Sequence, residues 1–241
     1  MNTSITNPQG EKIDYRFHGD ASDKSKIVLI GHGVTGNLDR PWAEGLANAL
    51  AEAGYPALRF SFSGNGDSEG DFRESTVSKE VSDLGAVIDA AKEAGYEEII
   101  YAGHSMGGAV GVLRASSDDR INRLISLAGM VHTAKFAEVE FGMETPNEGF
   151  MWEDEDCPLS STFVNDMNAI GSVLDKASDI HVPWLLIHGD ADDVVPIEES
   201  SEIYAHANEP KKFVELPGVN HVFANEGLAP MIDTVLVWLK D

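Results

Sequence analysis

The segment GHSMGG at residues 103–108 places a serine between two glycines in the G-x-S-x-G pattern. Apolar residues before it (EEIIYA) predict a strand, and the segment after it (AVGVLRA) predicts a helix. In that context the chain turns so tightly that side chains at positions 103 and 107 would collide, and the serine hydroxyl projects at a helix N-terminus. The positive end of the helix helps to hold developing negative charge. We therefore predict that Ser105 is a nucleophile.

A serine hydroxyl needs a base at neutral pH, usually a histidine oriented by a carboxylate. Around a strand–serine–helix turn the expected chain order is serine, acid, histidine. His188 precedes any suitable acid, and His206 falls on a helical pattern that favours a solvated ring. His221, in LPGVNHVF, follows the last predicted strand. We expect His221 to be the general base, with a structural loop histidine as the alternative.

The segment GDADDVVP at 189–196 offers three candidates for the acid, Asp190, Asp192 and Asp193. Adjacent aspartates repel one another, so we expect one to face the histidine while the others are solvated or cap the helix that begins near Pro196. Charge alone does not choose among the three. A triad explains the histidine and aspartates at 188–193 fully, so we expect neither a metal nor a cofactor.

Ester or amide chemistry also needs two backbone N–H groups that stabilise the oxyanion. The residue after the nucleophile, Met106, supplies one, and the loop HGVTG at 32–36 should supply the other from Val34. The alternative for this loop is a plain strand-to-helix turn. We expect His32 to hold the loop through hydrogen bonds and not to act as a base.

Short apolar runs that alternate with helical patterns must position these residues. Such alternation predicts a parallel sheet covered by helices on both faces, with its loops gathered at the carboxyl ends of the strands. We predict strands at 26–30, 57–62, 98–102, 124–128, 184–187 and 212–216, and helices at 42–53, 78–94, 105–115 and 230–239.

Residues 131–178 interrupt this rhythm with a strongly acidic segment that is rich in Phe, Met and Trp. A linker would contain fewer aromatic residues. The segment therefore predicts an inserted, mainly helical cap, and the alternative is ordinary extra helices packed beside the sheet.

Composition narrows the class of partner. The 241 residues include 41 Asp and Glu against 17 Lys and Arg, for a formal net charge of −24, which disfavours nucleic acid and anionic membranes as partners. Residues 136–210 contain 18 acidic residues and one basic residue. This concentration indicates either a solvated acidic surface or an acidic rim that disfavours anionic substrates. We expect a small-molecule substrate; the sequence does not indicate the oligomeric state.

The chain length suits one domain. We find no secretory signal and no apolar run near the roughly 20 residues of a membrane span. The single cysteine, Cys157, excludes an internal disulfide framework. These features favour a cytoplasmic protein.

Five segments together resemble the α/β-hydrolase superfamily of serine hydrolases. They are GHG at 31–33, RFSFSGNGDSEG at 59–70, GHSMGG at 103–108, HGDADDVVP at 188–196 and GVNH at 218–221. The resemblance implies that residues 1–241 form one domain around a mostly parallel eight-stranded sheet, with an antiparallel strand at 12–17. It also implies that the acid is Asp192, three residues after Gly189. Within the superfamily the chain resembles small bacterial carboxylesterases of the cinnamoyl or feruloyl esterase type.

We therefore expect a serine hydrolase that cleaves carboxylic esters with small or aromatic acyl groups through an acyl-enzyme. Ser105, His221 and Asp192 would form the triad. The same triad could act on thioesters, amides or carbon–carbon bonds, or in perhydrolysis. A hydrolase-like ligand-binding protein with little turnover and a structural scaffold are alternatives of a different class.

Overall fold

The computed structural model describes residues 4–240. Its centre is a seven-stranded sheet in the order β3-β5-β4-β6-β7-β8-β9, in which the described β3 alone runs antiparallel to its neighbour. The strands are β3 (Tyr15–His18), β4 (Lys26–Gly31), β5 (Ala57–Phe60), β6 (Glu98–His104), β7 (Ile121–Leu127), β8 (Trp184–Gly189) and β9 (Lys211–Leu216). The mostly parallel α/β architecture is thus confirmed.

The expected eighth strand does not join this sheet in the described chain. The segment 12–17 divides at Asp14, where the backbone N–H donates to the Ser68 hydroxyl (2.8 Å). Before that point β2 (Lys12–Ile13) pairs with β1 (Ile5–Thr6) in a separate two-stranded sheet, and after it β3 pairs with β5. The strand count of eight was therefore wrong because the N-terminal strands pair with each other.

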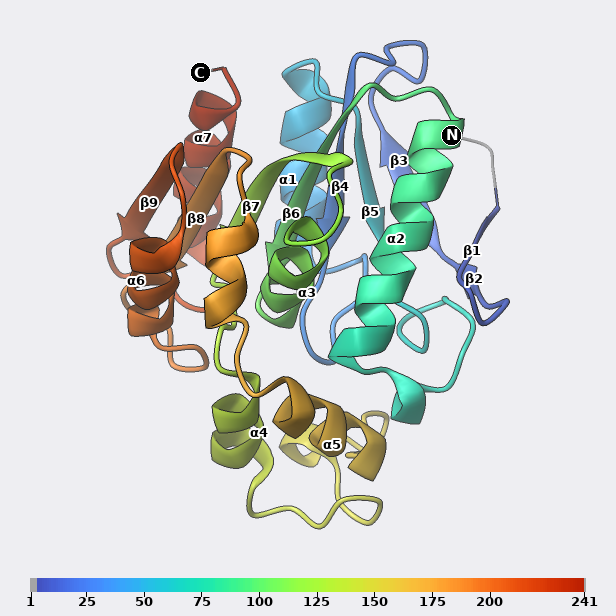
Figure 1. The fold of residues 1–241 in the computed structure, drawn as a ribbon, viewed down its shortest axis with the longest axis vertical. Helices are drawn as coiled ribbons and strands as arrows, with labels where there is room; N and C mark the ends of the chain where they lie inside the picture. Colours follow the sequence, from blue (N-terminus) through green and yellow to red (C-terminus); the bar gives the residue numbers. More distant parts are fainter. Residues whose placement is uncertain (1–3, 241) are drawn as a thin grey trace.

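Five helices cover the two faces of the sheet (Figure 1). They are α1 (Pro41–Glu52), α2 (Val77–Glu93), α3 (Met106–Ala115), α6 (Ile197–His206) and α7 (Leu228–Trp238). One apolar core joins the sheet to α2, α3 and α6, and a second joins it to α1 and α7. None of the helices within residues 4–240 combines the length and the apolar character needed to cross a membrane.

Local signals define these helices. Pro41 begins α1, where its missing N–H costs nothing. The Thr76 hydroxyl accepts a hydrogen bond from the backbone N–H of Lys79 (3.1 Å) and caps α2. Gly95, with φ +91°, ends the same helix in a left-handed conformation that glycine adopts at little cost.

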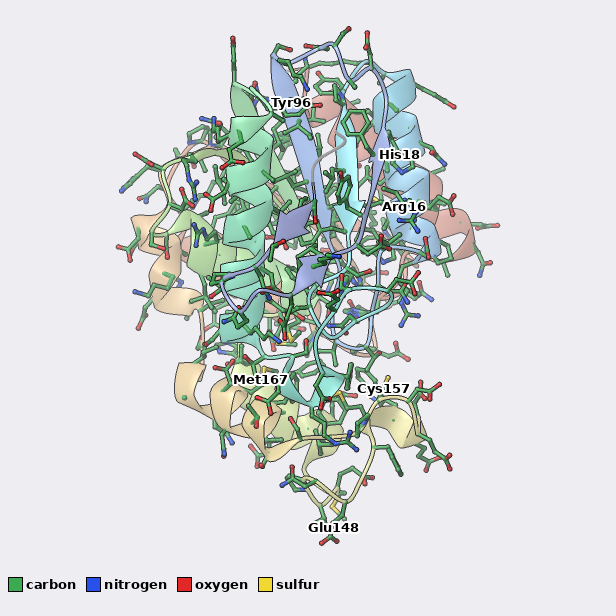
Figure 2. The ribbon with its side chains drawn as sticks, turned by 90° about the vertical axis from the view of Figure 1, so that its right-hand side faces the viewer. Arg16, His18, Tyr96, Glu148, Cys157 and Met167 are labelled. Carbon is green, nitrogen blue, oxygen red and sulfur yellow. The ribbon has the colours of Figure 1, made fainter. Side chains whose placement is uncertain are left out.

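Between β7 and β8 the chain forms α4 (Thr133–Phe141) and α5 (Ser161–Ile170), together with the short 3₁₀ helices η2 (Met151–Glu153) and η3 (Leu174–Asp179). Helices α4 and α5 contact each other and lie beyond one end of the sheet, below it in Figure 1. In Figure 2, Glu148 lies at the outer tip of this segment. We refer to residues 131–178 as the helical segment.

The sheet register brings four loops to the same edge. Gly31 at the end of β4 lies beside Gly103 of β6, which in turn lies beside Ser126 of β7. At the end of β8, Gly189 pairs with Leu216 of β9. The loops that follow β4, β6, β8 and β9 therefore meet where the parallel strands end, which is the usual ligand-binding edge of such sheets.

Candidate active site

Ser105 lies between β6 and α3 in a strained backbone conformation, with φ +54° and ψ −121°. The two neighbouring glycines make this turn possible. A Cβ at Gly103 would collide with the carbonyl oxygen of Gly107, and a Cβ at Gly107 would collide with that of His32. The sharp strand-to-helix turn expected from the sequence is thus present, and it holds Ser105 at the N-terminus of α3.

His221 and Asp192 meet at the same edge. His221 Nδ1 lies 2.7 Å from Asp192 Oδ2, and the Asp192 side chain is 1% exposed. The backbone N–H groups of Val194 and Val195 donate to Asp192 Oδ1, each at 2.9 Å. Burial alone would raise the pKa of Asp192, but hydrogen bonds from two histidines and from these N–H groups hold that pKa well below its usual range. The carboxylate therefore stays ionised and fixes the orientation of His221.

The two other aspartates of this loop lie elsewhere. Asp190 is exposed, and its Oδ1 accepts a hydrogen bond from the backbone N–H of Gly218. Asp193 is exposed and has no hydrogen bond or ion pair to any other residue in 4–240. Geometry therefore joins Asp192, and neither neighbour, to His221.

His188 has a role that we did not predict. Its ring is fully buried, and Nε2 lies 3.0 Å from Asp192 Oδ2 and 2.9 Å from the carbonyl oxygen of Val195. Both neighbours accept, so Nε2 carries a proton, while Nδ1 lies 2.7 Å from the Ser200 hydroxyl. His188 thus holds the same carboxylate oxygen that His221 contacts. The sequence signal for this contact was the position of His188 at the end of β8, four residues before Asp192. His206, as expected, is exposed on α6.

One cavity of about 320 Å³ joins the nucleophile to the base. Its lining residues come from four loops, from the end of β6, from α1 and from the helical segment: Gly33, Val34, Thr35, Gly36, Arg40, Trp42, His104, Ser105, Trp152, Val194, His221 and Val222. No hydrogen bond joins the Ser105 hydroxyl to His221 within the described residues. Such contacts are often long before substrate binds and tighten in the complex.

The loop after β4 passes close to the nucleophile. A Cβ on Gly33 would lie 2.7 Å from Ser105 Cβ, so a glycine is needed there. In residues 4–240 the N–H groups of Val34 and Met106 have no hydrogen-bond acceptor. Met106 begins α3, where a backbone N–H lacks an acceptor within the helix. Both N–H groups are therefore free to bind an oxyanion, the role that we predict for them.

Two further buried histidines, both neutral, hold the surrounding loops in place by hydrogen bonds. His32 Nε2 accepts from the Phe62 N–H (3.0 Å), and Nδ1 donates to the Gly33 carbonyl (2.9 Å). Burial lowers the pKa of His32 to about 4. His104 Nε2 donates to the backbone carbonyl of His221 (2.8 Å), and burial and the nearby His221 lower the pKa of His104 to about 3. His104 therefore ties the loop of the base to the nucleophile turn.

We expect His104 to make stability depend on pH. Its pKa is about 3 when folded and about 6.5 when unfolded, so between these values the unfolded chain binds the extra proton. The free energy of unfolding then falls as pH falls from 6 to 4, by about 1.4 kcal/mol per pH unit from this residue. Denaturant titrations at pH 6, 5 and 4 should show a shallower loss in His104→Gln, which retains a donor for the His221 carbonyl.

The matched control is His206→Gln, because His206 is exposed on α6. Its stability should fall with pH as steeply as that of the wild type. Equal slopes in wild type and His104→Gln would show that the ring of His104 is protonated in the folded protein.

A comparison with protein families gives one match across most of the chain. Residues 22–145 and 156–227 match the Hydrolase_4 family, described as serine aminopeptidase, S33. The matched residues include the serine turn and the acid and base loops. They also include most of the helical segment.

Individual proteins are also similar to most of this chain. The uncharacterized protein YfhR of Escherichia coli (strain K12) is 24% identical over 208 residues, which span 86% of this chain and 66%, just under two thirds, of that protein. The solved structure of Est1E from Butyrivibrio proteoclasticus, with ferulic acid bound, superposes with a TM-score of 0.88 at 26% identity and covers 98% of this chain and 97% of that chain. Alpha/beta hydrolase domain-containing protein 10 from mouse shares the fold, with a TM-score of 0.79 at 19% identity and coverage of 99% and 98%.

Proposed function

The chain belongs to the Hydrolase_4 family of serine aminopeptidase-like α/β-hydrolases, and from this premise we propose that it cleaves carboxylic esters through an acyl-enzyme on Ser105. The observation that carries the proposal is the buried contact of 2.7 Å between His221 Nδ1 and Asp192 Oδ2. His221 lines the same cavity as Ser105. A binding protein without turnover has no need of an oriented base beside a strained serine.

The proposed reaction follows from these positions. His221 Nε2 takes the proton of Ser105 as the serine oxygen attacks the acyl carbon, and the N–H groups of Val34 and Met106 bind the oxyanion. His221 then gives this proton to the ester oxygen as its bond to the acyl carbon breaks, and the alcohol leaves. Water, activated by the same ring, releases the acid. Asp192 keeps Nδ1 protonated throughout, and the donors from His188 and the backbone keep Asp192 in place.

We propose that the helical segment acts as a cap that forms the acyl pocket. Trp152, in η2, lines the cavity and is 44% exposed, and its indole N–H donates to Glu140 of α4 (2.7 Å). An indole face at the cavity wall suits an aromatic or apolar acyl group. The ferulic acid bound by Est1E is an aromatic acid, which supports the same class of substrate.

The family description also favours one second candidate, an aminopeptidase that cleaves amides. Such an enzyme must bind the α-ammonium group of its substrate. The described residues that line the cavity include no Asp or Glu, whereas Arg40 places a positive charge there. This charge repels an ammonium group, so the cavity favours ester over aminopeptidase substrates.

A substrate panel tests the proposal. We expect turnover of 4-nitrophenyl acetate, butyrate and octanoate and of methyl ferulate, and little release of 4-nitroaniline from amino acid 4-nitroanilides. A thioester and an activated carbon–carbon substrate complete the panel. Faster turnover of the anilides than of every ester would favour the amide alternative, and no turnover of any compound would contradict a hydrolase.

A further inference from the structure

The lining of the catalytic cavity has the opposite charge to the chain as a whole. The chain contains 41 Asp and Glu residues and has a formal net charge of −24. The described residues that line the cavity include no acidic side chain, and Arg40 is the one Lys or Arg among them. A fixed positive charge therefore lies in the same cavity as Ser105 and His221.

Most of the hydrogen-bond donors of Arg40 have no protein acceptor within residues 4–240. One, Nη2, donates to the backbone carbonyl of Thr35 (2.8 Å), and no carboxylate within residues 4–240 forms an ion pair with this side chain. Arg59, Arg114 and Arg120, by contrast, each pair with a carboxylate. Arg40 is also exposed, so a ligand can reach it. A guanidinium group has five N–H donors in a planar fork that matches the two oxygens of a carboxylate.

Arg40 lines the cavity together with Ser105 of the nucleophile turn and Trp152 of the helical segment. Its charge also contributes to lowering the pKa of His104, which burial lowers most. Burial raises the pKa of the Cys157 thiol to about 11, and Arg40 opposes that rise. Figure 2 shows Cys157 in the layer formed by the helical segment.

In the proposed reaction the acyl group on Ser105 has its carbonyl oxygen at the N–H of Val34, and Trp152 of the proposed cap lines the same cavity. The Thr35 carbonyl ties Arg40 to this same loop. We propose that Arg40 is a specificity-determining residue that binds a carboxylate on the acyl part of the substrate. The substrate class is then a monoester of a dicarboxylic acid, and this inference rests on the proposed ester hydrolysis.

The experiment compares two esters with one leaving group. Mono-4-nitrophenyl adipate has an anionic acyl part, and methyl 4-nitrophenyl adipate is its neutral counterpart. The measured quantity is the ratio of kcat/KM for the anionic ester to that for the neutral one, at constant ionic strength and after subtraction of the uncatalysed rate. Taking the ratio removes effects common to both esters, including a general change in the active site.

We expect Arg40→Gln to lower this ratio about tenfold, because a charge-assisted, two-point hydrogen bond to the carboxylate is lost. Arg40→Lys keeps the charge without the planar fork and should give an intermediate ratio. Arg73→Gln is the matched control: Arg73 is exposed, does not line the cavity and also lacks an ion pair within residues 4–240, so its ratio should equal that of the wild type.

An unchanged ratio in Arg40→Gln would overturn the inference and leave the proposed function intact. The ratio stays unchanged if kcat/KM is retained for both esters, or if it falls equally for both, and an equal fall would show that Arg40 acts through Thr35 on the oxyanion loop. Failure of the proposed function gives a different result, because the wild-type protein would then turn over neither ester, and the inference would fall with it.

Discussion

Replacing Ser105 by alanine should lower kcat/KM for 4-nitrophenyl butyrate by about 10⁴-fold or more. The reason is that the hydroxyl forms the bond to the acyl carbon, so its loss removes the covalent route. What remains is the rate that the oxyanion N–H groups and substrate binding provide without a nucleophile. The measurement is initial-rate kinetics with the thermal unfolding midpoint of each variant recorded in parallel.

The matched control is Ser117→Ala, at an exposed serine that follows α3. It should retain wild-type kcat/KM, because Ser117 does not line the cavity. Retention of more than a tenth of the wild-type activity in a folded Ser105→Ala protein would contradict the nucleophile assignment.

Asp192→Asn should lower kcat by about 10³- to 10⁴-fold. The change keeps the shape of the side chain but removes the charge that stabilises protonated His221. The amide can also present its NH₂ group to Nδ1 and so favour the wrong tautomer. Asp193→Asn, in contrast, changes an exposed carboxylate without a partner in the described chain and should stay within about twofold of wild type.

The comparison of these two variants decides which acid works with His221. An equal or greater loss of kcat in Asp193→Asn would transfer the role to Asp193. A normal kcat in folded Asp192→Asn would show that the contact of 2.7 Å is structural.

The predictable part of the site depends on local chain geometry. G-x-S-x-G between a strand and a helix allows one backbone path, which Ser105 follows with φ +54°. The alternation of strands and helices likewise predicted a parallel α/β sheet. The resemblance to α/β-hydrolases and bacterial esterases is confirmed by the family match and by the likeness to Est1E.

The unpredicted part depends on contacts between distant residues. His104 binds the carbonyl of a residue 117 positions away, and His188 shares one oxygen of Asp192 with His221. Both contacts depend on the direction and the tautomer of the histidine ring. Residue type and spacing determine neither the ring direction nor the tautomer. The pairing of β1 with β2, which removed the expected eighth strand, depends in the same way on where the chain turns in space.

The structure shows where acidic residues of the span 136–210 lie relative to the catalytic cavity. Of the acidic residues in 136–210, six line a neighbouring cavity of about 300 Å³: Glu140, Asp190, Asp192, Asp193, Glu198 and Glu199. The described lining of the catalytic cavity is free of them and contains Arg40 instead. Acidic residues of this span therefore gather beside the catalytic cavity and are absent from its described lining.

Intact-mass spectrometry with peptide mapping tests most directly whether Ser105 is the nucleophile. Brief treatment with a fluorophosphonate should add one label per chain, on the peptide that contains Ser105, and the label should be absent from Ser105→Ala. Slow labelling of Asp192→Asn would agree with a base that has lost its orientation. A stoichiometric label on another residue, or none on a folded wild-type protein, would contradict a nucleophilic Ser105.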